Sequence, residues 1–247
     1  MGQDNNKRIA KNTFLLYFRM IFVMLVSLYT SRKILDVLGV NDYGIYNVVG
    51  GVVSMFGFLN DSLSVATQRF LTYEIGRNDL EQLKKVFGAS CLIHYILAII
   101  IFILLETLGL WFLNNKMNIP IARVEAANWV FHTSMIAMTI GVIQTPYTAS
   151  ITAHERMDVF AYIGIVEAVL KLTIVLLLSF ISFDKLKLYG VLCLSVQLII
   201  MLSYRIFCSM SFPECRVKVG WDKSTWPLLT FTGWNIFGTL AWMLKDQ

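Results

Sequence analysis

The chain has 247 residues, of which 57% are hydrophobic and 15% are charged, and its mean hydropathy is +0.64. A soluble domain carries about 25% charged residues, so this composition excludes an ordinary soluble protein. The formal net charge of +5 does not indicate a nucleic-acid partner, because the Lys and Arg residues form no single stripe and no nucleic-acid-binding motif is present.

Long apolar runs divide the chain into segments that can span a membrane. A helix needs about 20 apolar residues to cross about 30 Å of hydrocarbon, and the runs lack the two-residue alternation of a membrane β-barrel. The sequence predicts an all-α, polytopic membrane protein with six full segments and a seventh that begins near Trp226. The six are 13–35, 43–69, 86–113, 125–151, 158–182 and 186–210.

Local signals mark the predicted breaks between segments. Gly39 suits the end of the first helix, and Asn41 or Asp42 suits the cap of the second. Asn78 with Glu81 resembles a capping box before the third segment.

A short internal similarity suggests a duplicated architecture. K-N-T-F-L-L at 11–16 opens the first segment, and K-S-T-W-P-L at 223–228 opens the seventh with the same spacing of Lys, Thr and aromatic residue. Residues 1–222 are therefore predicted to form an N-terminal six-helix lobe. Residues 223–247 are predicted to be the start of a truncated second lobe.

The distribution of basic residues predicts the orientation. Alternate connections carry twelve Lys and Arg on one side of the membrane and six on the other. The first side holds Lys7, Arg8, Lys11, Arg69, Arg77, Lys84, Lys85, Arg156, Arg205, Arg216, Lys218 and Lys223, and the second holds Arg32, Lys33, Lys116, Arg123, Lys185 and Lys187. Basic residues favour the cytoplasm, so we expect a cytoplasmic N-terminus.

The sequence contains no P-loop, G-x-G-x-x-G, H-E-x-x-H or G-x-S-x-G motif, so no enzymatic activity, cofactor or metal is expected. The informative residues are polar and ionisable side chains inside the apolar runs. A charge in hydrocarbon costs at least about 2.5–3.5 kcal/mol, so such residues usually face a bundle interior or a wet cavity.

Five such residues are the candidate substrate-binding set: Arg19, Asp61, Gln144, Glu167 and Lys171. In one interpretation, six helices surround an aqueous cavity with fixed positive charge from Arg19 and Lys171, which suits phosphate oxygens. In the alternative, Glu167 and Lys171 only neutralise each other at their i,i+4 spacing, and Arg19 pairs with Asp61 or with another helix.

Two further groups have a simpler interpretation. Glu106 lies where it can reach water at the outer interface, and His94 and His132 lie near helix ends, where a structural role is expected.

Several stretches resemble one family. They are A-K-N-T-F-L-L-Y-F-R-M (10–20), V-L-G-V-N-D-Y-G-I-Y-N-V-V-G-G (37–51), A-T-Q-R-F-L-T-Y-E-I-G-R-N-D (66–79), I-T-A-H-E-R-M-D-V-F-A-Y (151–162) and F-P-E-C-R (212–216). Together they resemble polysaccharide (O-antigen type) flippases of the multidrug/oligosaccharidyl-lipid/polysaccharide exporter superfamily. The L-G-x-x-x-Y-G-x-Y element is the most specific part.

The resemblance implies two six-helix lobes, of which this chain holds the first. It also implies a transporter that moves undecaprenyl-diphosphate-linked oligosaccharide across the bacterial inner membrane by alternating access, for lipopolysaccharide or other surface polysaccharide. Its implied partners are that glycolipid, membrane lipids, and H⁺ or Na⁺ as a coupling ion, with no nucleic acid.

Other functions stay open. A cation-coupled multidrug exporter of the same superfamily needs a carboxylate in the membrane, which Asp61 or Glu106 can supply, although segment 13–35 carries Arg19 instead. A membrane enzyme acting on glycolipids would need a large extramembrane loop. A non-transporting scaffold is the remaining alternative.

Overall fold

In the computed structural model, residues 2–181, 183–216, 219–221, 226–228, 230–231, 233–234 and 238 are described, with side chains from residue 10 onward. Every regular element in these ranges is helical, which confirms the predicted all-α class. The elements are α1 (Gly2–Ser54), α2 (Gly57–Arg77), α3 (Leu80–Leu104), the π-helical turn η1 (Leu105–Gly109), α4 (Leu110–Lys116), η2 (Ile121–Arg123), α5 (Val124–Ala153), α6 (Met157–Leu178), α7 (Lys185–Ser211) and η3 (Pro213–Arg216).

Five stretches of the described chain are long and apolar enough to cross a membrane. They are Ala10–Ser54, Leu80–Lys116, Ile121–Ala153, Met157–Leu178 and Lys185–Ser211. Four of them match expected segments, and the fifth, Ala10–Ser54, joins the first expected segment to part of the second.

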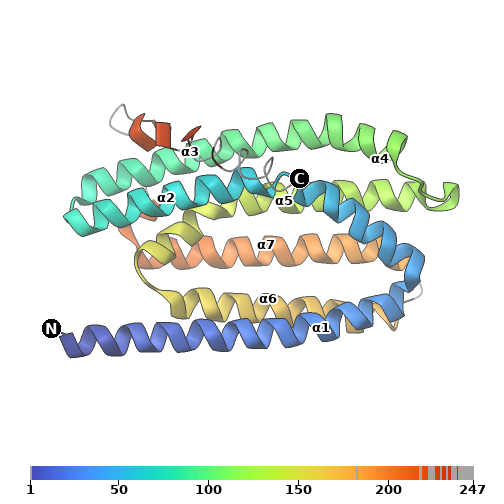
Figure 1. Cartoon of the computed structure of the whole chain (residues 1–247), viewed down its shortest axis with the longest axis horizontal. Helices are drawn as coiled ribbons and strands as arrows, with labels where there is room; N and C mark the ends of the chain where they lie inside the picture. The colour runs from blue at the N-terminus through green and yellow to red at the C-terminus, as the bar shows by residue number, and fades with distance from the viewer. Residues whose placement is uncertain are drawn as a thin grey trace.

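Gly39 accounts for this joining. The helical ribbon of α1 continues through it, but Gly39 has φ +77° and ψ 168°, a conformation essentially reserved for glycine. Figure 1 shows α1 changing direction and crossing the bundle toward α2. The predicted break at Gly39 is therefore confirmed as a bend inside one element.

The expected segment 43–69 is not one helix. It is divided at residues 55–56, and α2, which carries Asn60 and Asp61, falls below the apolar threshold of a spanning helix. Glycine lowers helix stability by about 1 kcal/mol per residue, and three glycines flank the break. Ser54 also donates a hydrogen bond from Oγ to the Gly51 carbonyl at 2.9 Å, which competes with the helical pattern.

The predicted capping box at Asn78 is wrong by one residue. Asn78 is in the left-handed conformation (φ 55°) and ends α2, while Asp79 caps α3 by accepting a hydrogen bond from the Gln82 amide at 3.0 Å. Asparagine tolerates the left-handed region better than most residues, so it suits the end of a helix.

The helices run between two ends of one bundle (Figure 1). One end, called here the Glu214 end, holds the start of α1, the α2–α3 turn, the α5–α6 turn and η3. The other, called the Arg123 end, holds the Gly39 bend, η2 and the start of α7. The two groups of connections in the basic-residue count thus lie at opposite ends.

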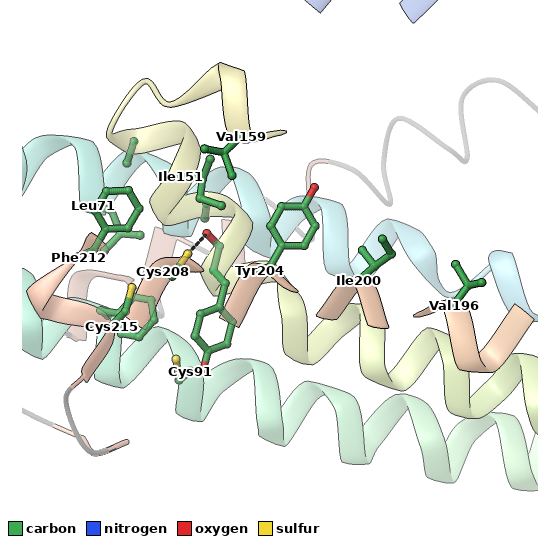
Figure 2. Packing of buried hydrophobic residues seen from close by; sticks show 14 of the residues in the cluster. Leu71, Cys91, Ile151, Val159, Val196, Ile200, Tyr204, Cys208, Phe212 and Cys215 are labelled. Carbon is green, nitrogen blue, oxygen red and sulfur yellow. Dashed lines mark hydrogen bonds between the residues drawn. The ribbon is translucent and has the colours of Figure 1, made fainter. Parts of the chain in front are cut away.

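The core is concentrated around α5, which packs against α2, α3 and α7, while α1 packs along α6. Near the Glu214 end, Leu71, Ile151, Phe212 and Cys215 belong to one buried cluster, as Figure 2 shows. In the same cluster the Cys208 thiol donates to the Tyr147 carbonyl at 3.4 Å. Small and branched apolar side chains let the helices approach closely here.

The predicted domain boundary at 222/223 lies outside the described residues. Beyond it, residues 226–228, 230–231, 233–234 and 238 are helical, where the seventh segment is expected.

The bend at Gly39 yields a stability prediction. Gly39→Ala places a Cβ in the glycine-only region, so we expect the thermal unfolding midpoint in detergent to fall, with a cost of about 1–3 kcal/mol. Gly44→Ala is the matched control, because Gly44 is helical and a Cβ there meets no atom within 4 Å. Equal midpoints for the two variants would show that the bend imposes no conformational constraint.

Candidate functional site

A cavity of about 580 Å³ lies inside the bundle. Its walls come from the second half of α1, from α2, α5 and α7, and from one residue of α6. The polar side chains that line it include Tyr46, Asn60, Asp61, Thr133, Lys171 and Gln197. Polar groups that converge on a partly open cavity in an otherwise apolar bundle mark it as the candidate binding site.

Two of the predicted site residues meet in this cavity. Asp61 of α2 and Lys171 of α6 both line it, although 110 residues separate them in the chain. Asp61 is exposed, and it makes no hydrogen bond or ion pair within the described part of the chain. Its carboxylate is therefore available to a bound cation, a proton or a substrate donor.

Lys171 has a partner. Its Nζ donates to Glu167 Oε1 at 2.6 Å, one helical turn earlier on α6, and the Lys171 side chain remains 49% exposed. Glu167 therefore offsets the positive charge that Lys171 brings to the wall. With Glu167 counted, the formal charges at the cavity are one positive and two negative, so the site has no excess of positive charge and carries one free carboxylate.

Gln144 reaches the site through another amide. Gln197 of α7 lines the cavity and donates from Nε2 to Gln144 Oε1 at 3.3 Å. On the same helix as Gln144, Thr145 donates from Oγ1 to Asn60 Oδ1 at 2.8 Å. These two hydrogen bonds orient the side-chain amides of Asn60 and Gln197, whose other polar atoms, Asn60 Nδ2 and Gln197 Oε1, are left for the cavity.

Arg19 is placed elsewhere. It is not among the residues lining the cavity, and its guanidinium lies 4.4 Å from the centre of the Phe160 ring, a cation–π contact between α1 and α6. Its Nε is buried without a hydrogen-bond partner, and a Cβ on Gly164 would clash with it.

Arg19 of α1 nevertheless contacts the same face of α6 that carries the cavity lysine. Phe160, Gly164, Glu167 and Lys171 follow the i, i+4, i+7, i+11 spacing of one helical stripe. Lys171 is seven residues beyond Gly164, or about 10 Å along the helix. Tyr204 of α7 interacts electrostatically with both Arg19 and Glu167. Arg19 therefore lies near one end of this stripe of α6, and Lys171 lies at the other end.

The sequence analysis did not select the hydroxyl-bearing and small residues of the wall. Tyr46, Thr133 and Tyr189 line the cavity, and Gly190 leaves space for Thr133, whose Oγ1 would lie 2.6 Å from a Cβ at that position. Tyrosine, threonine and glycine are common in membrane helices, so no sequence signal distinguishes these positions.

A larger groove of about 1020 Å³ lies between α2 and the described residues after 225. It is mainly apolar, and its one charged side chain is Arg69, which stacks 4.5 Å from the Phe231 ring centre. None of the five predicted site residues lines it. We therefore assign the smaller polar cavity as the candidate site.

Charged groups tie the helices together at the Arg123 end. Arg123 of η2 bonds Asp42, just after the Gly39 bend, at 2.6 Å, and Asp184, at the start of α7, at 2.9 Å. Asp184 also caps α7 through the Leu186 amide at 3.1 Å. Three segments that are distant in the sequence are thereby held at one end of the cavity-bearing bundle.

A second polar cluster lies at the Glu214 end and joins two of the family-like stretches. Glu214 of F-P-E-C-R is 1% exposed, and its Oε1 is 2.7 Å from His154 Nε2 and 3.1 Å from Ser150 Oγ. His154 belongs to I-T-A-H-E-R-M-D, and its ring stacks on Phe212 at 4.1 Å. The cluster fastens the chain after α7 to the α5–α6 turn.

The fold is shared with a known transporter. Comparison with solved structures finds a multidrug resistance MATE family transporter of the MOP superfamily, in an outward-facing conformation, with a TM-score of 0.73 and 16% sequence identity. The match covers 95% of this chain and 52% of that transporter, so the chain spans about half of its length. Comparison of the sequence with protein-family models and with curated proteins gives no match.

This likeness shows the fold of the molecule. The chain is all-helical, its fold is similar to about half of that transporter, and five of its described stretches are long and apolar enough to cross a membrane. The superfamily is the one that the sequence stretches resemble.

The Glu214 cluster yields a pH prediction. Burial raises the pKa of Glu214, but the hydrogen bonds that it accepts, chiefly from His154, outweigh burial, so its pKa lies below the ordinary value of 4.5. The stability that Glu214 contributes is therefore present above pH 4.5 and is lost as the pH falls through the lowered pKa. We expect Glu214→Gln to lower the unfolding free energy at neutral pH by about 1–3 kcal/mol.

The measurement is thermal unfolding in detergent from neutral pH downward. The unfolding midpoint of Glu214→Gln should fall less steeply at low pH than that of the wild type, because the variant has no carboxylate at this position to protonate. Glu81→Gln is the control, because Glu81 is 80% exposed at the same end and pairs only with Lys84. A Glu214 variant with the stability and pH profile of the wild type would mean that the cluster is energetically neutral.

Proposed function

We propose that this chain is the cavity-bearing lobe of a membrane exporter that works by alternating access, without covalent chemistry. The observation that carries the proposal is the 580 Å³ cavity, in which Asp61 and Lys171 meet inside an apolar bundle. The exporter fold supports it. Charged side chains such as Asp61 and Lys171 are costly at membrane depth unless water or a substrate occupies the cavity that they line.

For the substrate, we propose a lipid-linked (undecaprenyl-diphosphate) oligosaccharide used for lipopolysaccharide or another surface polysaccharide. The supports are the family resemblance of the five stretches and the ammonium group of Lys171 at the wall. A diphosphate can compete with Glu167 for this ammonium, and the amides of Asn60 and Gln197 can bond sugar hydroxyls. Arg19 of α1, which contacts the same face of α6, is proposed to meet the same headgroup at another stage of transport.

The proposed location is the bacterial inner membrane with the N-terminus in the cytoplasm. The support is that the basic-rich connections gather at the Glu214 end (Figure 1), which would then face the cytoplasm.

A second candidate is a cation-coupled multidrug exporter. Two observations favour it: Asp61 faces the cavity without a partner, and Glu167 offsets the charge of Lys171. A free carboxylate in a cavity whose lysine is already neutralised suits a cationic drug, H⁺ or Na⁺ better than a diphosphate.

Three substitutions distinguish the two functions. For an anionic glycolipid, Lys171→Ala should weaken transport about 10- to 100-fold, the loss expected for one hydrogen bond to a charged group of about 1.5–3 kcal/mol. Glu167→Gln should then preserve or increase transport, because it frees the ammonium. For a cation-coupled exporter, Asp61→Asn should abolish active export and Lys171→Ala should have little effect.

The assay is restoration of surface glycan by the complete protein in a bacterial strain without its own glycan flippase, in parallel with cationic-drug resistance. Lys187→Ala is the control, since Lys187 pairs with Glu125 outside the cavity at 2.6 Å. Protein level in the membrane is measured for each variant. Full glycan restoration by Lys171→Ala would remove the glycolipid proposal.

A further inference from the structure

A π-helical turn interrupts the span Leu80–Lys116. In η1 the Leu110 amide bonds the Leu105 carbonyl, the five-residue spacing of a π-helix, and Thr107 Oγ1 donates to the Ile103 carbonyl at 2.7 Å. Such single π-turns in membrane helices often occur at functional sites, because the extra residue changes the direction of the side chains around it. The charged residue in this turn is Glu106.

Glu106 lies on an apolar outer surface. Its side chain is 43% exposed, and Ile103 and Leu108 on its own span, and Trp129 on α5, are also exposed. It is eight residues before Asn114, or about 12 Å along the helix, and further exposed apolar residues lie between the two. An ionised carboxylate without a partner is costly at such a position.

The partner is His132 of α5. Its Nε2 is 3.6 Å from Glu106 Oε2, and its Nδ1 is 2.7 Å from the Asn128 carbonyl oxygen. A carbonyl oxygen only accepts hydrogen bonds, so Nδ1 carries a proton and Nε2 is left facing the carboxyl group.

The number of protons on the two facing atoms decides the net charge of the pair. With one proton on either Oε2 or Nε2, the pair is net neutral, either as carboxylic acid with imidazole or as carboxylate with imidazolium. With no proton there the pair carries one negative charge, and with two it carries one positive charge. Both charged states are costly in an apolar setting.

The charged groups on the packed elements do not complete this pair otherwise. On α4, Lys116 lies 5.7 Å from the Trp111 ring centre, and on α5 Glu125 pairs with Lys187. On α3, Glu81, Lys84 and Lys85 lie in the first two turns, and His94 bonds the Ser90 carbonyl. In the second half of α1, Asp42 pairs with Arg123.

Side-chain amides support the turn of α5 that holds His132. Asn128, whose backbone carbonyl accepts the Nδ1 proton, exchanges side-chain hydrogen bonds with Asn114 of α4 at 3.2 and 3.3 Å. Both side chains are at least partly exposed, and α4 ends two residues after Asn114, at Lys116.

We propose that Glu106 and His132 together form a single proton-binding site. It is distinct from the cavity of Asp61 and Lys171. Its use as the site of the coupling proton rests on the proposed export function, whereas proton binding itself does not.

The first experiment is a proton titration of the purified protein in lipid nanodiscs, recorded as the difference between wild type and variants. Glu106→Gln/His132→Asn should lack one bound proton relative to the wild type across neutral pH. His132→Asn alone should shift the midpoint of this proton by at least one pH unit, because it keeps an Nδ1-like donor but removes Nε2. Glu125→Gln, an exposed carboxylate at the start of the same helix, should leave the neutral range unchanged.

Unfolding midpoints confirm that each variant is folded. Identical neutral-range titrations of wild type and the double variant would overturn the proposal. An unshifted midpoint in His132→Asn would also overturn it, because Glu106 would then titrate as an isolated carboxyl group.

The second experiment separates proton binding from export. In proteoliposomes, an imposed pH gradient should accelerate substrate movement by the wild type and by Glu125→Gln. Glu106→Gln should lose the acceleration. If the wild type moves no substrate, the exporter proposal fails while the titration still decides the proton site. If Glu106→Gln keeps the acceleration, the coupling role fails.

Discussion

The structure depends on one constraint: hydrocarbon offers no hydrogen-bond partner to a polar or charged side chain. Apolar surface therefore covers the outside of the bundle, and polar groups must face an internal cavity, pair with one another or lie at a helix end. Each arrangement occurs here. Asp61 faces the cavity, Glu167 pairs with Lys171, and Arg123 gathers two carboxylates at one end.

The two ends of the bundle are organised differently, and both bear on how the lobe could move. At the Arg123 end an ion cluster joins the bend after Gly39 to the starts of α5 and α7. At the Glu214 end a buried carboxylate and a stacked histidine fasten the chain after α7. With both ends fastened, the lobe is suited to move as a rigid body, which is the motion that alternating access requires.

The charge of the cavity decides between the candidate substrates. A lysine already bonded to a glutamate attracts an anion less than a free lysine, and an anion must displace the glutamate to gain the full interaction. The free carboxylate of Asp61, in the same cavity, favours cations. The glycolipid proposal therefore depends on exchange of partners at Lys171, and the multidrug alternative depends on Asp61.

The sequence by itself determined the membrane class, the all-helical fold and the bend at Gly39, because apolar run length and glycine backbone freedom are local properties. It also selected Asp61, Gln144, Glu167 and Lys171 as polar residues in apolar runs, and i,i+4 spacing was enough to foresee the Glu167–Lys171 pair. It did not locate the division of segment 43–69 at residues 55–56, because that break results from several weak local effects, namely the flanking glycines and the Ser54 hydrogen bond.

Tertiary structure alone decided which of these residues share a cavity. Helical periodicity gives the face of each residue but not the neighbour that the face meets, so the sequence joined Arg19 with Lys171, whereas packing set Arg19 against Phe160 and Gly164. The same reason hid the His154–Glu214 and Glu106–His132 pairs. Their partners are 60 and 26 residues apart, and they meet because separate helices pack side by side.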